Sequence, residues 1–407
     1  MTAARQDRND GRAGAGITVI IATLSMFGPF SIDTVFPAFD QMGRQFGVSV
    51  VAMQQVTSVY LLSFAIMSLL HGPISDAVGR KPVIIVGTLM YAAASVGCAL
   101  SVNLPMLLIF RVLQGMSAGS GQIISRAMIR DLFDGPAAQR LMAQVMMIFS
   151  VAPALAPIIG GWMLGLGSWP IIFWFLAAYG VVMCLVTVFG LPETHPPAAR
   201  SPLRLGRLTH GLVEVGRHGT FVRLAMASSL GFAGQFLYVV AAPIVVVRLL
   251  GKGEQDFWML FVPMIGGMLL GSFSNSRLAG RVAGTTLATV GFTTAVAAGV
   301  LNVAVSALPG APHLPWAVLA PALIALGVAL AFPTLQISML DLFPRQRGSA
   351  ASMQSFTQLV LNAILAGLVA PLVTGSVLHL ALTSLGFSVA GSLLWTWHRR
   401  STPIVRH

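Results

Sequence analysis

Twelve long apolar stretches dominate this sequence of 407 residues and restrict its fold to a bundle in a membrane. Each is close to the roughly 20 residues that an α-helix needs to cross the hydrocarbon core of a bilayer. Helices are expected because lipid offers the backbone no hydrogen-bond partners, and the stretches are too long for the strands of a barrel. Only 9% of the residues are charged, against about 25% in a soluble protein. The sequence therefore predicts an all-α polytopic membrane protein. The twelve expected spans are 17–40, 50–71, 82–101, 105–127, 139–165, 170–190, 221–249, 256–276, 285–307, 315–340, 349–373 and 376–397.

A polar, proline-rich connection at 191–220 divides the expected spans into six and six. The two halves show a weak sequence similarity, since Gly72-Pro-Ile-Ser-Asp76 at the end of the second span is similar to Gly271-Ser-Phe-Ser-Asn275 at the end of the eighth. Such repeats are typical of transporters whose site lies where the repeats meet. We predict two pseudo-symmetric six-helix bundles. The predicted parts are an N-terminal tail at 1–16, a first bundle at 17–190, a linker at 191–220, a second bundle at 221–397 and a C-terminal tail at 398–407.

The basic residues predict the orientation of the chain, because positive charge gathers on the cytoplasmic side of a membrane. With the N-terminus inside, nearly all of the 24 Lys and Arg fall in cytoplasmic segments. Arg44, Arg248 and Lys252 fall outside, and Arg111 lies within a span. Both termini are therefore predicted to be cytoplasmic. The net charge of +12 does not indicate nucleic-acid binding, because the arginines are scattered over short loops.

The sequence offers no sign of an enzyme: no metal-ligand cluster, nucleotide loop or nucleophile triad stands out. Without a nucleotide-binding segment the energy must come from an ion gradient. The two cysteines, Cys98 and Cys184, both fall in apolar stretches, which predicts free buried thiols and no disulfide.

One acid stands inside the first span. Asp33 is the sole carboxylate well within the hydrocarbon zone of the expected spans. A charged group there is costly and persists mainly where it binds an ion, a proton or a substrate. Arg111 in the fourth span lies at a similar depth, about 10 Å from the outer end at about 1.5 Å per residue. We interpret the two as partners in one aqueous cavity. The alternative is two separate residues, each satisfied by backbone or water.

The segment after the second span reads GPISDAVGRK, and it matches a long signature, G-x-x-x-D-x-x-G-R-K. The matching residues are Gly72, Asp76, Gly79, Arg80 and Lys81, and through them the chain resembles the major facilitator superfamily. Gly72 is expected to let helices approach, Gly79 to permit a tight turn, and Asp76 to pair with a base or cap a helix. We predict a conformational latch. A polar turn with topology-fixing charge is the alternative.

Further segments narrow this resemblance. Arg111 and Gln114 match the R-x-x-Q-G signature of the superfamily, and a stretch of the fifth span resembles an antiporter signature with Ala156 in place of its first glycine. That stretch contains Pro153, Ala156, Pro157, Gly160 and Gly161. Simple close packing of bent helices is the alternative interpretation of the stretch. With RAMIRDLF after the fourth span, LPETHPP after the sixth and DLFPRQRGSAAS before the eleventh, the chain is similar to the Bcr/CflA drug-resistance branch of twelve-helix proton antiporters.

The resemblance implies export of drugs or amphipathic small molecules across a bacterial inner membrane, by alternating access and against inward proton flow. It assigns the coupling to Asp33 and Arg111 and implies no cofactor beyond the proton gradient. Desolvation favours a neutral Asp33 and a nearby arginine favours the charged form, and the sequence leaves open which prevails. The expected partners are a small-molecule substrate, protons and the lipid bilayer, with no nucleic acid, and the expected state is a monomer.

The substrate cavity is expected to have an apolar and adaptable wall, for which methionine and aromatic side chains are suited. The candidates are Tyr60, Gln114, Met146, Met147, Gln235, Phe236 and Tyr238. Two other functions stay open: a proton-coupled transporter of one metabolite, as exporter or symporter, and a non-transporting membrane sensor. A sugar or peptide symporter usually needs more polar residues in its cavity, and a sensor would need no gating segments.

Overall fold

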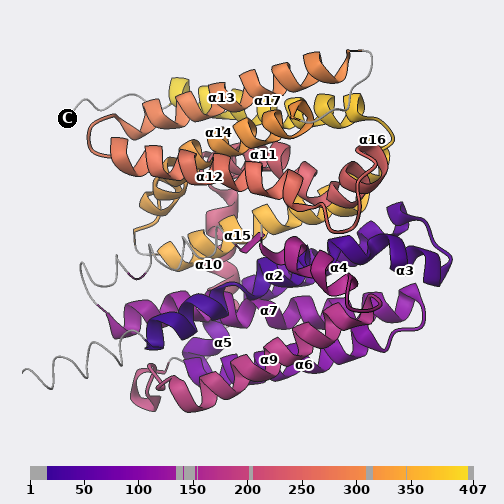
Figure 1. Ribbon diagram of the computed structural model, residues 1–407. Coiled ribbons are helices and arrows are strands. Elements are labelled where there is room, and N and C mark those ends of the chain that lie inside the picture. The colour runs from indigo at the N-terminus through magenta and orange to yellow at the C-terminus, as the bar shows by residue number, and fades with distance from the viewer. Residues whose placement is uncertain are drawn as a thin grey trace, which may run out of the picture. The chain divides into compact units, whose positions relative to one another are not determined.

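The computed structural model describes residues 16–133, 141, 152–153, 155–200, 205–308, 315–344 and 346–401. In these residues the regular elements are helices, most of them long and packed along their length (Figure 1). Eight are long and apolar enough to cross a membrane. These spans are α4 (Val50–Ser68), α6 (Arg80–Ala99), α9 (Pro170–Gly190), α12 (Trp258–Leu278), α13 (Gly284–Ser306), α14 (Trp316–Asp341), the run Arg347–Val373 formed by α15 (Arg347–Ile364), η4 (Leu365–Val369) and α16 (Ala370–Val373), and α17 (Val377–Ser401).

The remaining expected spans are bent, polar or only partly described. Two bent pairs each pass as one span: Gly16–Ser25 with Phe30–Phe46, and α11 (Gly219–Val240) with the π-helical segment η3 (Pro243–Leu249). α7 (Leu104–Leu132) has 29 residues, but its arginines and its run of Gly and Ser lower its hydropathy. Leu155–Leu164 is the helix described within the fifth expected span. Together these helices account for all twelve spans, so the predicted all-α membrane fold is confirmed.

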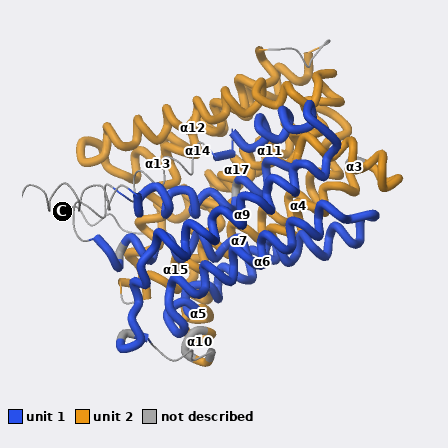
Figure 2. Tube along the Cα trace, turned by 60° about the horizontal axis from the view of Figure 1, so that its bottom comes forward, with its two compact units in different colours: residues 1–35, 62–204 blue, residues 36–61, 205–407 orange. Residues whose placement is uncertain are grey.

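The chain forms two compact units (Figure 2). Unit 1 comprises Met1–Val35 and Leu62–Arg204, and unit 2 comprises Phe36–Leu61 and Leu205–His407. The segment Phe36–Leu61 therefore packs with the second half of the sequence although it belongs to the first. The predicted division into six and six helices is a statement about chain order and stays a prediction.

Each unit is built from helices that pack side by side. In unit 1, α6 lies against both α7 and α9. In unit 2, α14 lies against α12 and α13, and α17 lies against α11 and α13 (Figure 1).

Three spans are interrupted close to a proline. In the first span, α2 (Phe27–Asp33) is followed by a single 3-10 turn, η1 (Phe36–Ala38), which contains Pro37, and then by α3 (Phe39–Phe46). In the seventh span Pro243 begins η3, and in the eleventh Pro371 follows η4. Proline has no backbone N–H and so removes the donor that an earlier carbonyl would use. These breaks therefore leave polar backbone groups inside the membrane-spanning helices.

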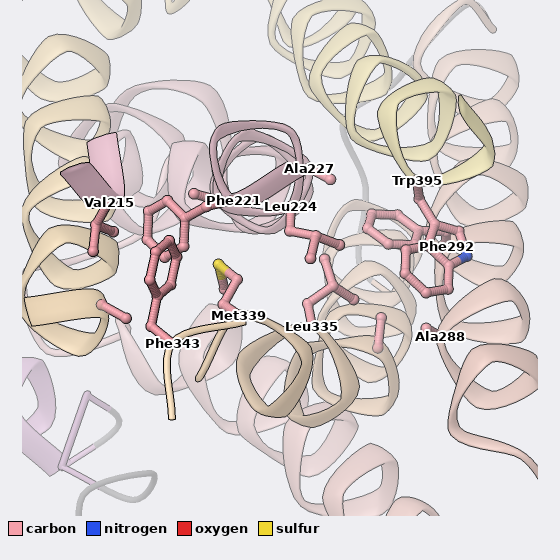
Figure 3. Close-up of a cluster of buried hydrophobic side chains, with 13 residues drawn as sticks. Val215, Phe221, Leu224, Ala227, Ala288, Phe292, Leu335, Met339, Phe343 and Trp395 are labelled. Carbon is pink, nitrogen blue, oxygen red and sulfur yellow. The ribbon is translucent and has the colours of Figure 1, made fainter. Parts of the chain in front are cut away.

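A cluster of buried apolar side chains holds one end of unit 2 (Figure 3). Phe292 stacks on Trp395 with ring centroids 6.2 Å apart, and Phe221 meets Phe343 edge-on at 5.9 Å. Rings of this size bury a large apolar area and favour such offset and edge-on pairs. Val215 joins the cluster from α10 (Leu205–Arg217), an amphipathic helix within the stretch predicted as a polar linker. The linker therefore contains a helix that packs on unit 2, which the sequence reasoning had not identified.

Two smaller expectations are also settled. Cys98 and Cys184 are free and buried, as predicted. The segment after the second span, expected as a loop, contains a short helix, α5 (His71–Val78).

Candidate functional site

Asp33 is the last residue of α2, directly before the turn that leads into η1, and it lies after the 47° bend between Gly16–Ser25 and Phe30–Phe46. Only 4% of the residue is exposed, so its carboxylate is withdrawn from solvent. In the described part of the chain no hydrogen bond or ion pair involves this carboxylate. A helix end also leaves backbone groups without intrahelical partners. The acid is therefore buried where α2 ends and the helix is interrupted.

Arg111 lies fully buried in α7 and is tied to the helix that carries the acid. Its Nη1 donates to the Ser31 carbonyl oxygen at 3.1 Å and to Gln114 Oε1 at 2.6 Å. Ser31 precedes Asp33 by two residues in α2. The ion pairs within 4.0 Å among the described residues include none between Asp33 and Arg111. The arginine thus reaches the turn that holds the acid through its backbone.

Three residues with hydroxyl groups, Ser31, Tyr91 and Ser95, complete this cluster. Gln114 Nε2 donates to Ser95 Oγ at 2.7 Å, and Ser95 Oγ donates to the Tyr91 carbonyl at 2.7 Å. The Tyr91 hydroxyl is hydrogen-bonded to Ser31 Oγ, which closes the path from α7 through α6 to α2. Sequence reasoning missed Ser31, Tyr91 and Ser95, because single hydroxyls in apolar helices form no distinctive pattern. They hold the arginine and its glutamine in place.

The fifth-span stretch approaches the same helix break. Gly160 packs on the Thr34 carbonyl, and a methyl group at this glycine would overlap the carbonyl oxygen. Thr34 is the residue directly after Asp33. Close packing is therefore present at this glycine, where it supports the chain beside the acid. In the same stretch Ala156, Pro157 and Gly161 are also buried and Pro153 is partly buried.

Three of the predicted cavity residues lie buried in α11 of unit 2. Gln235 Nε2 donates to Met268 Sδ at 3.1 Å, and the Tyr238 hydroxyl accepts a hydrogen bond from Asn302. Phe236 is buried in the same helix and stacks on Phe232, with ring centroids 5.7 Å apart. These contacts give the interior of unit 2 around α11 a mixed apolar and polar character.

The other predicted cavity residues lie elsewhere in the chain. Tyr60 is fully buried in the part of α4 that belongs to unit 2. Gln114 uses both ends of its amide inside the arginine cluster, so it positions Arg111. Met146 and Met147 lie outside the described residues.

The predicted latch residues lie in an ionic network within unit 1. Arg80 Nη1 pairs with Asp76 at 2.5 Å, and Arg80 Nε pairs with Asp131 Oδ2 at 3.1 Å. Arg80 is buried while Asp76 is half exposed, so the guanidinium joins α5, α6 and the end of α7. Asp131 comes from the RAMIRDLF segment that supported the resemblance.

A third acid of this network caps the start of α6. Glu193 accepts hydrogen bonds from the backbone N–H of Arg80 at 3.0 Å and of Lys81 at 3.3 Å. An anion at a helix N-terminus meets unpaired N–H groups and the positive end of the helix dipole. Lys81 Nζ in turn donates to the Val188 carbonyl near the end of α9, at 2.8 Å. Glu193 comes from the LPETHPP segment, and its role was not predicted.

The two glycines of the segment behave differently. Gly79 has φ +113°, a conformation that L side chains rarely adopt, which confirms the predicted turn. Gly72 was expected to let helices approach, and this expectation is wrong: a Cβ there would meet nothing within 4 Å.

The comparisons with known proteins agree with this architecture. The model of the Major Facilitator Superfamily matches residues 19–367, and the chain belongs to that family. It is a transporter and not an enzyme, and it is a multi-pass protein of the bacterial inner membrane. Proteins of this family are secondary transporters that generally act without a cofactor, and their setting implies a small-molecule substrate and a lipid bilayer.

Two relatives and two solved structures illustrate the match. A bicyclomycin resistance protein homolog of Haemophilus influenzae is 29% identical over 66% of this chain and 67% of its own length. Multidrug resistance protein D of Escherichia coli is 28% identical over 88% of this chain and 89% of its own length. A bacterial homolog of the human lysosomal transporter Spinster gives a TM-score of 0.72 at 17% identity, covering 96% of this chain and 97% of its own. A D-xylose–proton symporter gives 0.72 at 14% identity, covering 95% and 98%.

Proposed function

We propose that this protein exports drugs or other amphipathic small molecules across the bacterial inner membrane in exchange for protons, by alternating access. The names of the relatives, which refer to bicyclomycin and multidrug resistance, support the substrate class. The observation that carries the proposal is Asp33, a buried carboxylate at a helix break, close to a buried arginine cluster. A carboxylate at such a depth persists mainly where it exchanges a proton or binds an ion or substrate.

In this proposal Asp33 holds the exchanged proton and Arg111 senses its state. The arginine is anchored two residues away on the acid's own helix, so a rearrangement of the break changes the distance between the two charges. A nearby cation favours the charged carboxylate, and withdrawal from water favours the neutral one. A proton can drive a conformational change only if it binds the two states unequally. The helix break beside Asp33 provides a place where such a difference can arise.

The other assignments follow the same logic. We assign Tyr60, Gln235, Phe236 and Tyr238 to the substrate wall, together with Met146 and Met147, because polarisable and aromatic groups suit loosely specific binding. We assign the network around Arg80 to a cytoplasmic latch, in a monomer with both termini in the cytoplasm.

The test uses the purified protein in liposomes that contain a pH-sensitive dye, with an imposed pH gradient and a panel of cationic, neutral and zwitterionic compounds. Wild type is expected to move protons when a substrate is added, and Asp33→Asn is expected to lose this movement while remaining folded. Asp40→Asn is the matched control, because this partly exposed acid lies seven residues further on and pairs with Arg44. Coupling should survive in the control.

Each other outcome contradicts part of the proposal. If Asp33→Asn retains substrate-driven proton movement, the coupling acid lies elsewhere. If a single compound class moves protons in wild type, the protein is a transporter of one metabolite. If no compound does so, the sensor alternative gains over transport.

A further inference from the structure

Two neighbouring glutamines of α4 each donate to a backbone carbonyl of another span in unit 2. Gln54 Nε2 donates to the Val240 oxygen at 2.9 Å, and Gln55 Nε2 donates to the Gly367 oxygen at 2.9 Å. Val240 is the last residue of α11 and Gly367 lies inside the π-helical segment η4. One short stretch of α4 is thus hydrogen-bonded to both the seventh and the eleventh spans.

Prolines explain why these two carbonyls are available. Gly367 lies four residues before Pro371, which has no N–H to complete the helical bond. Val240 lies three residues before Pro243, and the amide four residues after it, that of Ile244, donates instead to the Ala241 oxygen at 2.9 Å. A carbonyl without a donor is costly inside a membrane. The glutamine amides supply the donors that these helices lack.

The same stretch of α4 also lies unusually close to the eleventh span. Ser58 Oγ donates to the Ala363 oxygen at 2.9 Å, one helical turn after Gln54 and Gln55. A methyl group at Gly367 would overlap Ser58 Oγ, so the absence of a side chain permits this approach. The contact is therefore carried by directional polar bonds to backbone, which break completely over a small displacement.

The boundary between the two units cuts α4 shortly after these residues. Leu61 belongs to unit 2 and Leu62 to unit 1, so one continuous helix connects both units. A relative movement of the units must bend α4 at this boundary or release its first part from unit 2. We propose that Gln54 and Gln55 form a releasable clamp, which holds the first part of α4 on the seventh and eleventh spans in one state and lets go in the other. This inference rests on the alternating access of the proposed function.

The clamp is tested by the reactivity of a buried thiol and needs no transport. Cys98 and Cys184 are replaced by serine, and Thr57, which is 1% exposed and one turn from Gln54, is replaced by cysteine. The labelling rate with a maleimide is then measured on purified protein. The double variant Gln54→Met and Gln55→Met keeps the shape of the side chains and removes both donors. We expect labelling about 25-fold faster in the double variant, and about fivefold faster with one substitution, from the usual net strength of a hydrogen bond.

The matched control is Gln358→Met, because the amide of Gln358 bonds to Asn362 within its own helix at 3.3 Å. Its labelling rate should stay within twofold of the parent. A thermal unfolding curve shows that each variant is folded. Unchanged labelling in a folded double variant would overturn the clamp.

A second arm asks whether the proline is the cause. Pro371→Ala restores a helical N–H that can serve the Gly367 carbonyl, so Gln55→Met should then change labelling less than twofold. Neighbouring residues that share one bond are expected to be non-additive in this way. A fivefold effect of Gln55→Met in both backgrounds would refute the proposed origin of the acceptor. If the labelling results hold while the liposome assay shows no exchange, the clamp stands as a conformational contact and the proposed exchange function fails.

Discussion

The second and the eighth spans end in similar sequences that the fold uses in opposite ways. After the second span, Gly72 faces open space and Asp76 pairs with Arg80 at 2.5 Å. Near the end of the eighth span, inside α12, Gly271 packs on the Leu326 carbonyl, which a methyl group would overlap, and Asn275 Nδ2 donates to the Leu330 oxygen at 2.7 Å. The first segment forms an ion pair, and the second packs closely against a neighbouring helix.

The arginines that follow show the same contrast. Arg80 is buried and meets two acids, Asp76 and Asp131. Arg281 is exposed, and in the described part of the chain no acid lies within ion-pair distance of it. Asp76 is half exposed, so water can replace its contact with Arg80 when the pair separates. The comparison teaches that similar sequences can form a separate short helix in one half, α5, and continue the span in the other, α12, and that their surroundings decide their contacts. The first of the two is better suited to switching.

The largest effect is expected when the same side chain is added at Gly271 and at Gly72. Gly271→Val should lower the free energy of unfolding by about 3 kcal/mol, because the new side chain overlaps the Leu326 carbonyl and overpacking of this kind is costly. Gly72→Val should change it by less than about 0.5 kcal/mol, since nothing lies within 4 Å. Thermal unfolding in detergent measures both. Equal losses of unfolding free energy in the two variants would show that the two glycines are packed alike.

An exchange of the polar residues has a smaller expected effect. Asn275→Asp removes the donor to the Leu330 oxygen and places a carboxylate beside a carbonyl, which should cost roughly 1–3 kcal/mol. The reciprocal Asp76→Asn should cost less than about 1 kcal/mol, because the Asp76 side chain is 48% exposed and Arg80 keeps Asp131. The unfolding midpoints of the two variants give the comparison. It fails if Asp76→Asn is the more damaging substitution.

The smallest effect is expected at the N-terminal end of α6, where Glu193 caps the helix. Glu193→Gln keeps one acceptor oxygen for the N–H groups of Arg80 and Lys81 and loses the charge, which should cost about 0.5–1 kcal/mol. α13 begins after Ala283 with no side-chain cap and offers no equivalent. Glu214→Gln serves as control, because Glu214 is exposed on α10 and the glutamine oxygen can still accept the hydrogen bond from Gln346. A drop in the unfolding midpoint no greater than that of the control would mean that the cap contributes nothing.

Much of the fold and the centre of the site could be predicted, because both follow from the cost of placing groups in lipid. The length of the apolar stretches predicted the spans, and the expense of a charge in lipid indicated Asp33 and Arg111 as the candidate functional pair. The turn at Gly79 was predictable because few residues besides glycine adopt its backbone angles. The partners of these residues were not predictable, since Ser31 and Tyr91 are ordinary residues whose importance depends on which helices meet.

Sequence by itself determined the helical membrane fold, the family and the identity of the buried charges, because transfer into lipid penalises each polar group whatever its neighbours are. Tertiary structure alone decided which carbonyl each glutamine of α4 meets and that Gly160 supports the chain after Asp33. It also decided that Phe36–Leu61 packs with the second half of the chain. These are contacts between residues far apart in sequence, and their energies depend on distances that only the packed helices set.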